Sequence, residues 1–115
     1  MIAIIDSGGA NIASVQFALE RLGARSVLTS DAAEIAAADR VLLPGVGAAP
    51  VAMKTLSDAQ LIEPIRQLRQ PVLGICLGMQ LLFGHSFEGD TDLLGVLDGA
   101  CHAFTPVSYT HLRAH

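Results

Sequence analysis

Short apolar runs alternate with amphipathic stretches along most of the chain. Residues 2–5 are continuously apolar and end at Asp6, as is typical of a strand buried on both faces. Beyond the following glycines, apolar residues recur at steps of three and four, which predicts a helix with one buried face. The residues of that stripe are Ile12, Val15, Leu19 and Leu22. We expect Asn11 to cap this helix at its start and Gly23 to end it.

The same alternation continues toward the middle of the sequence. Residues 26–29 predict a second strand, and Asp31 with Glu34 predicts a capped start for a short helix. Residues 41–43 predict a third strand, which we expect to be broken at residues 44–47. Two more helices are expected, with Pro50 and Pro64 in their first turns and the second running to about Gln70. A fourth strand at residues 71–75 is followed by a helix from Gly78 toward His85.

Strands separated by helices predict an α/β fold, a parallel sheet with helices on both faces. The run of elements stops before a doubly wound sheet would usually be complete. We therefore expect residues 1–106 to be the N-terminal part of a larger domain whose sheet is incomplete at its C-terminus. Residues 107–115 contain the only Tyr and two of the four His, and their apolar residues follow neither a helical nor a strand period. They resemble translated adapter or vector sequence, so we expect a non-native tail; the alternative is an ordinary terminal strand and turn.

Composition narrows the class of protein. The 115 residues carry 7 basic and 11 acidic side chains, a net charge of −4, and 51% of them are hydrophobic. That hydrophobic content excludes a disordered chain, and the acidic balance argues against a partner such as nucleic acid or an anionic membrane. No apolar run is long enough for a membrane span, and no signal peptide is evident. Cys76 and Cys101 form no CxxC pair, so we expect a reduced, cytoplasmic protein without disulfide, metal or other cofactor.

The most informative stretch is Gly74-Ile75-Cys76-Leu77-Gly78, between a buried strand and a helix. A glycine two residues before and two residues after a nucleophile is typical of a nucleophile elbow, in which the chain reverses sharply and the nucleophile adopts a strained backbone angle. The following helix N-terminus favours the thiolate, and the Leu77 N–H points to where an oxyanion would form. The alternative is a buried structural cysteine flanked by packing glycines.

A second motif, Pro44-Gly45-Val46-Gly47, also follows a buried strand. Ligands of parallel α/β sheets bind at these carboxyl ends. A glycine loop there can turn backbone N–H groups toward an oxyanion, although most such strings are plain turns.

Together these motifs carry a family resemblance. The run from Gly74 to Leu82 resembles the nucleophile segment of class I (triad) glutamine amidotransferases, and residues 44–47 resemble their oxyanion strand. Within that class, residues 5–15 with the strings LLPGVGA and LGICLGMQLLF resemble the glutaminase subunit of imidazole glycerol phosphate synthase. The resemblance runs from Met1 to about Phe104 and implies a flavodoxin-like amidotransferase fold.

The resemblance also implies roles for individual residues. Cys76 would attack the side-chain amide of L-glutamine, with the N–H of Leu77 and a peptide of the loop at Gly45, Val46 and Gly47 forming the oxyanion hole. The ammonia would pass to a cyclase subunit, the partner in a heterodimer that forms imidazole glycerol phosphate in histidine biosynthesis. The remaining implied residues are Gly45, Gly47, Gln80 and Glu88 for glutamine binding, and Gly8, Gly9 and Asn11 near the cyclase. For Gln80 and Glu88 the alternative is a solvated helix face, and for the last three a simple turn.

The family triad also needs a His base and a Glu, both late in a chain of about twice this length, and neither motif is present. On a continuous helix His85 would lie half a turn away from Cys76 and about 13 Å along the axis, so we expect a surface histidine. We expect His102 on a loop or strand surface, and His111 and His115 lie in the tail. This chain is therefore expected to be inactive by itself.

Two other functions remain open at this point. One is another elbow-cysteine protein, either a different amidotransferase or a protease or chaperone of the DJ-1 type, although the LGMQ run disfavours the DJ-1 type. The other is a non-catalytic fragment that only docks to a cyclase-like partner. A reading frame continuing past Pro106 into a His-x-Glu pair would favour the enzyme.

Overall fold

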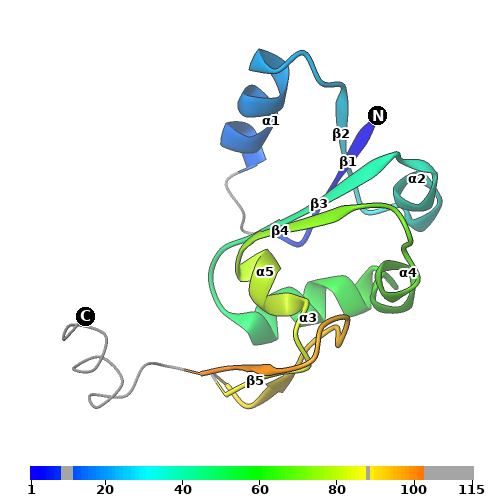
Figure 1. The fold of residues 1–115 in the computed structure, drawn as a ribbon. Helices are drawn as coiled ribbons and strands as arrows, with labels where there is room; N and C mark the ends of the chain where they lie inside the picture. The colour runs from blue at the N-terminus through cyan, green and yellow to red at the C-terminus, as the bar shows by residue number, and fades with distance from the viewer. Residues whose placement is uncertain (9–11, 88, 103–115) are drawn as a thin grey trace.

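A computed structural model describes residues 1–8, 12–87 and 89–102 of the chain. Within them, each of the first four strands is followed by one helix, or by two after β3, and three short strands come after Leu81 (Figure 1). The strands are β1 (Ile2–Ile5), β2 (Ser26–Thr29), β3 (Arg40–Gly45), β4 (Val72–Cys76), β5 (His85–Ser86), β6 (Thr91–Asp92) and β7 (Ala100–Cys101). The helices are α1 (Ile12–Arg21), α2 (Ala32–Ala37), α3 (Ala49–Asp58), α4 (Ile62–Arg66) and α5 (Leu77–Leu81).

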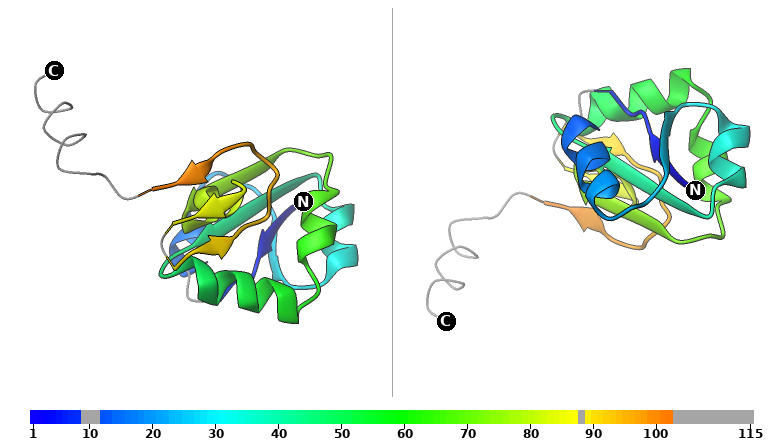
Figure 2. Two further views of the ribbon diagram at one scale, coloured as in Figure 1. Left: turned by 90° about the horizontal axis from the view of Figure 1, so that it is seen from below. Right: turned by 90° about the horizontal axis from the view of Figure 1, so that it is seen from above.

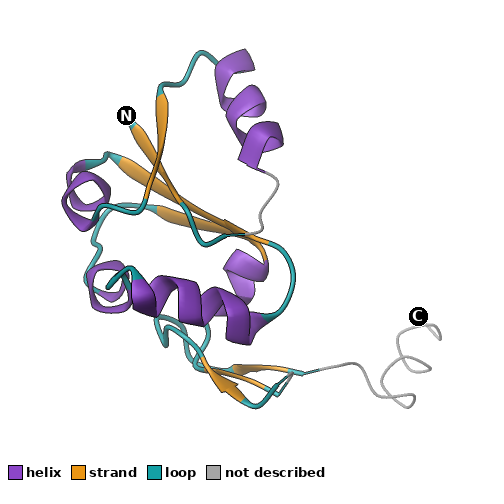
Figure 3. Cartoon of the chain, turned by 180° about the vertical axis from the view of Figure 1, so that it is seen from behind, coloured by secondary structure: helices purple, strands orange, loops and turns teal. Residues whose placement is uncertain are grey.

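The first four strands form one parallel sheet in the order β2-β1-β3-β4. In Figure 1, α1 lies above this sheet and α3, α4 and α5 lie below it, and the view from behind in Figure 3 shows the same separation. The predicted class, a parallel α/β sheet with helices on both faces, is therefore confirmed. Because parallel strands end at one edge, the carboxyl ends of β3 and β4 lie side by side, with Gly45 paired to Cys76.

The core fills the side of the sheet that faces α2, α3, α4 and α5. Residues such as Ile5, Leu43 and Leu81 are fully buried there. Leu93 and Leu94, which follow β6, complete this core from below. The elements that carry Cys76 and the Gly45–Gly47 segment are thus anchored in the best-packed part of the molecule.

The helix α1 is packed more loosely than the apolar stripe predicts. None of its residues is fully buried, and Leu22, predicted as part of the buried face, is 79% exposed. The reason is the end of the helix: α1 ends at Arg21, and Gly23 with φ of 73° turns the chain away. The N–H groups of Gly23 and Ala24 bond the carbonyls of Glu20 and Leu19, the pattern of a Schellman motif, so the predicted glycine stop is confirmed. Asn11 lies outside the described residues.

Two boundaries differ from the predictions. β3 does not break at Pro44 but continues through Gly45, because the proline faces a side of the strand where no backbone donor is needed. α4 ends at Arg66 rather than near Gln70. The Gln70 side chain instead donates hydrogen bonds to carbonyls at the end of α2, those of Ile35, Ala36 and Ala38. Gln70 therefore caps the end of the neighbouring helix.

The predicted capped start of α2 is present in a modified form. The Asp31 side chain accepts a bond from the Ala33 N–H, as expected of an N-cap. Glu34 does not bond the Asp31 N–H directly, as it would in a capping box. It accepts a hydrogen bond from the hydroxyl of Thr29, and that hydroxyl accepts one from the Asp31 N–H.

The second sheet, in the order β6-β5-β7, was not predicted from the sequence. The expected continuation of a helix to His85 is wrong: α5 ends at Leu81, and His85 begins β5. Strands of two residues give no periodic signal, which explains the omission. The two views of Figure 2 show this sheet beside α5 and α3.

Candidate active site

The turn between β4 and α5 has the geometry predicted for a nucleophile elbow. Cys76 is the last residue of β4 and the N-cap of α5, and its backbone has φ of 55° and ψ of −122°. Positive φ is rare for a residue with a side chain and persists only where the surroundings enforce it. The Cys76 side chain is exposed and free, so the alternative of a buried structural cysteine is wrong.

Two glycines enforce this conformation by letting backbone approach backbone. A Cβ atom on Gly74 would lie 2.6 Å from the Met79 Cα, and one on Gly78 would lie 1.7 Å from the Leu43 carbonyl oxygen. Both distances are far below ordinary carbon contacts, so any side chain at either position would force the strand and helix apart. The spacing Gly-x-Cys-x-Gly is therefore a packing requirement here.

The Pro44–Gly47 segment lies against the first turn of α5. A Cβ on Gly45 would lie 3.1 Å from the Gly78 nitrogen and 3.3 Å from the Leu77 Cβ, so the end of β3 nearly touches the start of the helix. Gly47 has φ of 94° with open space around it, which suits a loop whose backbone turns outward. The Val46 side chain is about half exposed. The structure thus brings the two glycine motifs together at one edge of the sheet.

Around this junction, Leu77 and Gln80 belong to α5. Leu77 is the first residue of the helix, where a backbone N–H has no intrahelical partner, while its side chain is buried in the core. Gln80 follows Cys76 by four residues and is half-buried, rather than part of a fully solvated face. Cys76 itself is not helical, so the spacing of four places Gln80 one turn into α5 without fixing the direction of its amide.

The remaining predicted site residues are described only in part. Gly8 comes after β1 with φ of 75°, as in a strand-to-helix turn, and a Cβ added there would be in ordinary contact with the side chain of Thr55 in α3. Gly9, Asn11 and Glu88 lie outside the described residues, as do His111 and His115.

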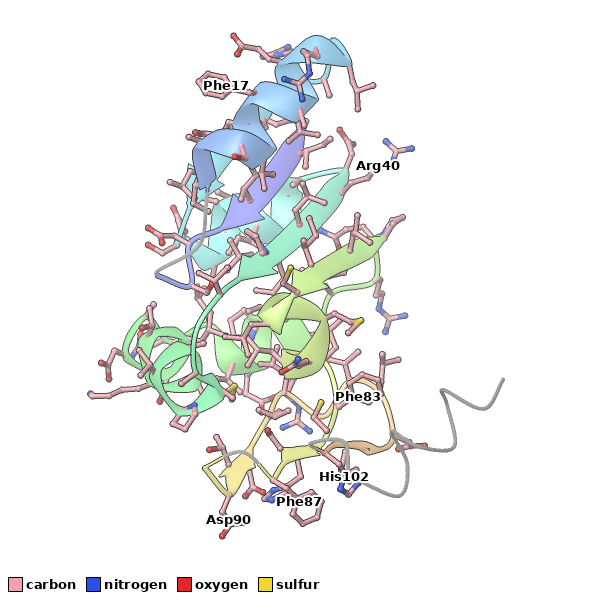
Figure 4. All side chains as sticks on the ribbon, turned by 90° about the vertical axis from the view of Figure 1, so that its left-hand side faces the viewer. Phe17, Arg40, Phe83, Phe87, Asp90 and His102 are labelled. Carbon is pink, nitrogen blue, oxygen red and sulfur yellow. The ribbon has the colours of Figure 1, made fainter. Side chains whose placement is uncertain are left out.

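The two described histidines are engaged in the small sheet. His85 is held between two carboxylates, with Nδ1 3.0 Å from Asp92 Oδ1 and Nε2 3.0 Å from Asp90 Oδ1. The hydrogen bond to Asp92, followed by that to Asp90, raises the pKa of His85 above its ordinary value of 6.5. His102 stacks on Phe87 with ring centroids 4.5 Å apart, and Figure 4 shows this pair with Asp90 at the far end from Phe17. The prediction of a helical His85 is replaced by this paired histidine.

Sequence reasoning missed two polar residues near the junction. Ser7 is buried and donates a hydrogen bond of 2.8 Å to the Pro44 carbonyl, directly before the glycine loop. The thiol of Cys101 lies 3.8 Å from the Gln80 carbonyl. Cys101 belongs to neither glycine motif, and Ser7 lies within residues 5–15, whose family resemblance gave its hydroxyl no role. The only further signal was the position of Ser7 just after a buried strand.

The described residues also bear on metal binding and membrane insertion. The described residues hold no group of three or more His, Cys, Asp or Glu side chains able to bind a metal ion. Among the helices in the described ranges, none combines the length and apolar character needed to cross a membrane.

Known proteins share this arrangement of motifs. Residues 3–101 match the family model for glutamine amidotransferase class-I. The chain is 57% identical over 105 residues to the imidazole glycerol phosphate synthase subunit HisH of Xanthomonas axonopodis pv. citri, covering 91% of this chain and 52% of that protein. It is 58% identical over 96 residues to the HisH of Idiomarina loihiensis, covering 84% of this chain and 49% of that protein.

The chain therefore spans about half the length of the curated relatives it matches. The family match, in contrast, covers nearly all of the described residues and contains both glycine motifs. On this evidence the chain belongs to the class-I glutamine amidotransferase family.

Proposed function

We propose that residues 1–106 are the N-terminal part of a cytoplasmic glutaminase subunit that supplies ammonia to a cyclase forming imidazole glycerol phosphate. Residues 107–115 then form a non-native tail. The proposal is supported by the names of the relatives and by one observation above all: a strained, exposed Cys76 fixed between two glycines beside the Gly45–Gly47 loop.

The chemistry of the proposal begins at the Cys76 sulfur. Its thiolate attacks the side-chain amide carbon of glutamine, and the carbonyl oxygen becomes an oxyanion in a tetrahedral intermediate. Collapse of that intermediate expels ammonia, which requires a proton, and leaves a thioester. Water then attacks the thioester, releases glutamate and returns the thiol.

The oxyanion is assigned to backbone N–H groups at the junction of the two motifs. Leu77 supplies one N–H from the start of α5, and the loop at Val46 and Gly47 supplies the second. Gly45, Gly47, Gln80 and Glu88 contact the rest of the glutamine. The close packing of Gly45 against Leu77 and Gly78 supports this assignment, because it keeps the two donors within one small region.

The proposal assigns the proton transfers to residues beyond this chain. His85 is committed to Asp90 and Asp92, and His102 to Phe87, so neither is offered as the base. We accordingly propose that the 115-residue chain alone does not turn over glutamine. The full-length protein would dock on its cyclase partner through a surface that includes Gly8, Gly9 and Asn11.

A glutamine-like diazo-ketone tests the proposal. In full-length protein it should alkylate Cys76, and excess glutamine should protect that thiol. Cys101 is the internal control, because it is half-buried and belongs to neither glycine motif. A Cys76→Ser variant should lose both labelling and glutamate release. Labelling of Cys101 in preference to Cys76, or glutamate release by the serine variant, would contradict the proposed site.

A second measurement addresses the partner and the missing base. Full-length protein should co-elute with a (β/α)₈ cyclase subunit in gel filtration and release glutamate faster in its presence. The 115-residue chain should release none under the same conditions, since general acid–base catalysis contributes about 10²–10⁴-fold per role. Comparable turnover by the short chain would contradict the assignment of the base to the remaining half.

A further inference from the structure

The buried hydroxyl of Ser7 joins the loop after β1 to the start of the glycine loop after β3. Ser7 is only 1% exposed, and its Oγ donates a hydrogen bond of 2.8 Å to the carbonyl oxygen of Pro44. The two residues are 37 positions apart, so this bond fixes two separate segments to each other.

The sheet explains why the Pro44 carbonyl needs this donor. The Val41 N–H bonds Pro71 ahead of β4, so Val41 and the alternate residues of β3 face β4, whereas Pro44 faces β1. The paired register of β1 with β3 reaches only to Ile4 and Leu42. Beyond that point β1 follows β2, with the Asp6 N–H bonded to the Thr29 carbonyl. The Ser7 side chain therefore continues the contact between β1 and β3 after the ladder has ended.

The Ser7–Pro44 hydrogen bond lies directly before the Gly45–Gly47 loop, which carries one of the proposed oxyanion donors. Proline has no N–H and a fixed φ, and Gly45 is paired to Cys76 of β4, so the Ser7 bond holds the carbonyl side of the Pro44–Gly45 peptide while β4 holds the other side. With that peptide held, the rotations left to the loop are those at Gly45, Val46 and Gly47. An unpaired buried carbonyl would instead favour another orientation, because an unsatisfied polar group is costly.

We propose that Ser7 is a positioning residue. Its hydroxyl holds the Pro44–Gly45 peptide and so fixes the distance between the Gly45–Gly47 loop and Cys76. This inference rests on the proposed glutaminase function and deepens it. Ser7 also precedes Gly8, so a change in the loop after β1 reaches the oxyanion loop through one hydrogen bond.

The test uses full-length protein with its cyclase partner and compares three variants. Ser7→Ala removes the donor, Ser7→Thr retains a hydroxyl, and Thr29→Val is the matched control. Thr29 also ends a strand of the sheet, is 7% exposed and has a hydrogen-bonded hydroxyl, but that hydroxyl bonds Glu34 rather than the loop. Two rates are measured: glutamate release, which needs the oxyanion hole, and alkylation of Cys76 by iodoacetamide, which does not.

For Ser7→Ala we expect kcat for glutamate release to fall roughly 10–100-fold and KM to change by less than about threefold. This is the pattern expected when only stabilisation of the transition state is lost. Alkylation of Cys76 should stay at the wild-type rate, because the elbow itself is intact. Ser7→Thr should recover most of kcat, and Thr29→Val should lower the thermal midpoint without changing kcat.

If the wild type is active and Ser7→Ala has the same kcat, the inference is overturned and the proposed function stands. The inference is also overturned if Thr29→Val lowers kcat as much, or if alkylation slows in parallel with glutamate release. A wild-type protein whose Cys76 reacts but which releases no glutamate would overturn the proposed function and this inference with it.

Discussion

Around Cys76, backbone meets backbone through three glycines, whereas on the other side of the sheet α1 contributes no fully buried residue. The β3–β4–α5 junction also supplies Leu43, Leu77 and Leu81 to the core. α1 instead exposes Phe17 (59%), as Figure 4 shows, and Leu22, the residue directly after the helix, is 79% exposed. The candidate catalytic half of the site is thus held by close packing, and the helix after Gly8 depends little on the core.

The difference shows where the sequence has freedom to vary. At the junction, one added methyl group meets fixed backbone atoms, so function and folding constrain the same positions. At α1, an added or removed methyl group meets solvent or half-exposed neighbours. Matched substitutions in the two regions should therefore have very different effects on stability.

The largest contrast is expected from adding one methyl group to a glycine in each region. Gly78→Ala places a Cβ 1.7 Å from the Leu43 carbonyl oxygen and should lower the free energy of unfolding by more than about 3 kcal/mol. Gly23→Ala meets open space and has only the strain of φ at 73°, about 1 kcal/mol. Urea unfolding followed by circular dichroism measures both. Equal losses would show that the junction relaxes and is not rigid.

The next contrast removes side chains instead of adding them. Leu81→Ala empties a fully buried position in α5 and should cost about 2–5 kcal/mol. Leu22→Ala removes a side chain that is 79% exposed and should stay within about 0.5 kcal/mol of wild type. The same unfolding titrations apply. A large loss for Leu22→Ala would mean that α1 is packed in solution as the apolar stripe predicts.

The smallest effect concerns the small sheet beside the junction. Hydrogen bonds to Asp92 and Asp90 raise the pKa of His85 in the folded protein above the unfolded value of about 6.5. Protonated His85 therefore stabilises the fold fully below pH 6.5, and this stabilisation is lost as the pH rises through the folded pKa. Wild type should therefore lose stability relative to His85→Gln as the pH rises above about 6.5. Thermal midpoints of both proteins across this range give the difference, and parallel curves would contradict the carboxylate pairing.

Much of the fold was predictable because its signals are local. Continuous apolar runs predicted β1, β3 and β4, residues 26–29 predicted β2, and the Gly-x-Cys-x-Gly spacing indicated the elbow at Cys76. The glycine stop of α1 at Gly23 was likewise readable from one residue.

Other features depend on distant segments and could not be read from the pattern. The exposure of Leu22 depends on where the chain turns after Arg21, and the early end of α4 depends on Gln70 bonding carbonyls of α2. The strands β5, β6 and β7 are too short for any period and exist because they pair with one another. The Ser7–Pro44 bond joins residues 37 positions apart, beyond the reach of any local motif.

The stacking of Phe87 on His102 has a spectroscopic consequence. The sequence contains no Trp and only one Tyr, at position 109, so intrinsic fluorescence reports little on residues 1–102. The two rings lie 4.5 Å apart and within 18° of parallel, which places imidazole protons in the shielding cone of the phenyl ring. Their upfield-shifted proton resonances give an intrinsic NMR reporter for assembly of the small sheet, free of any added label.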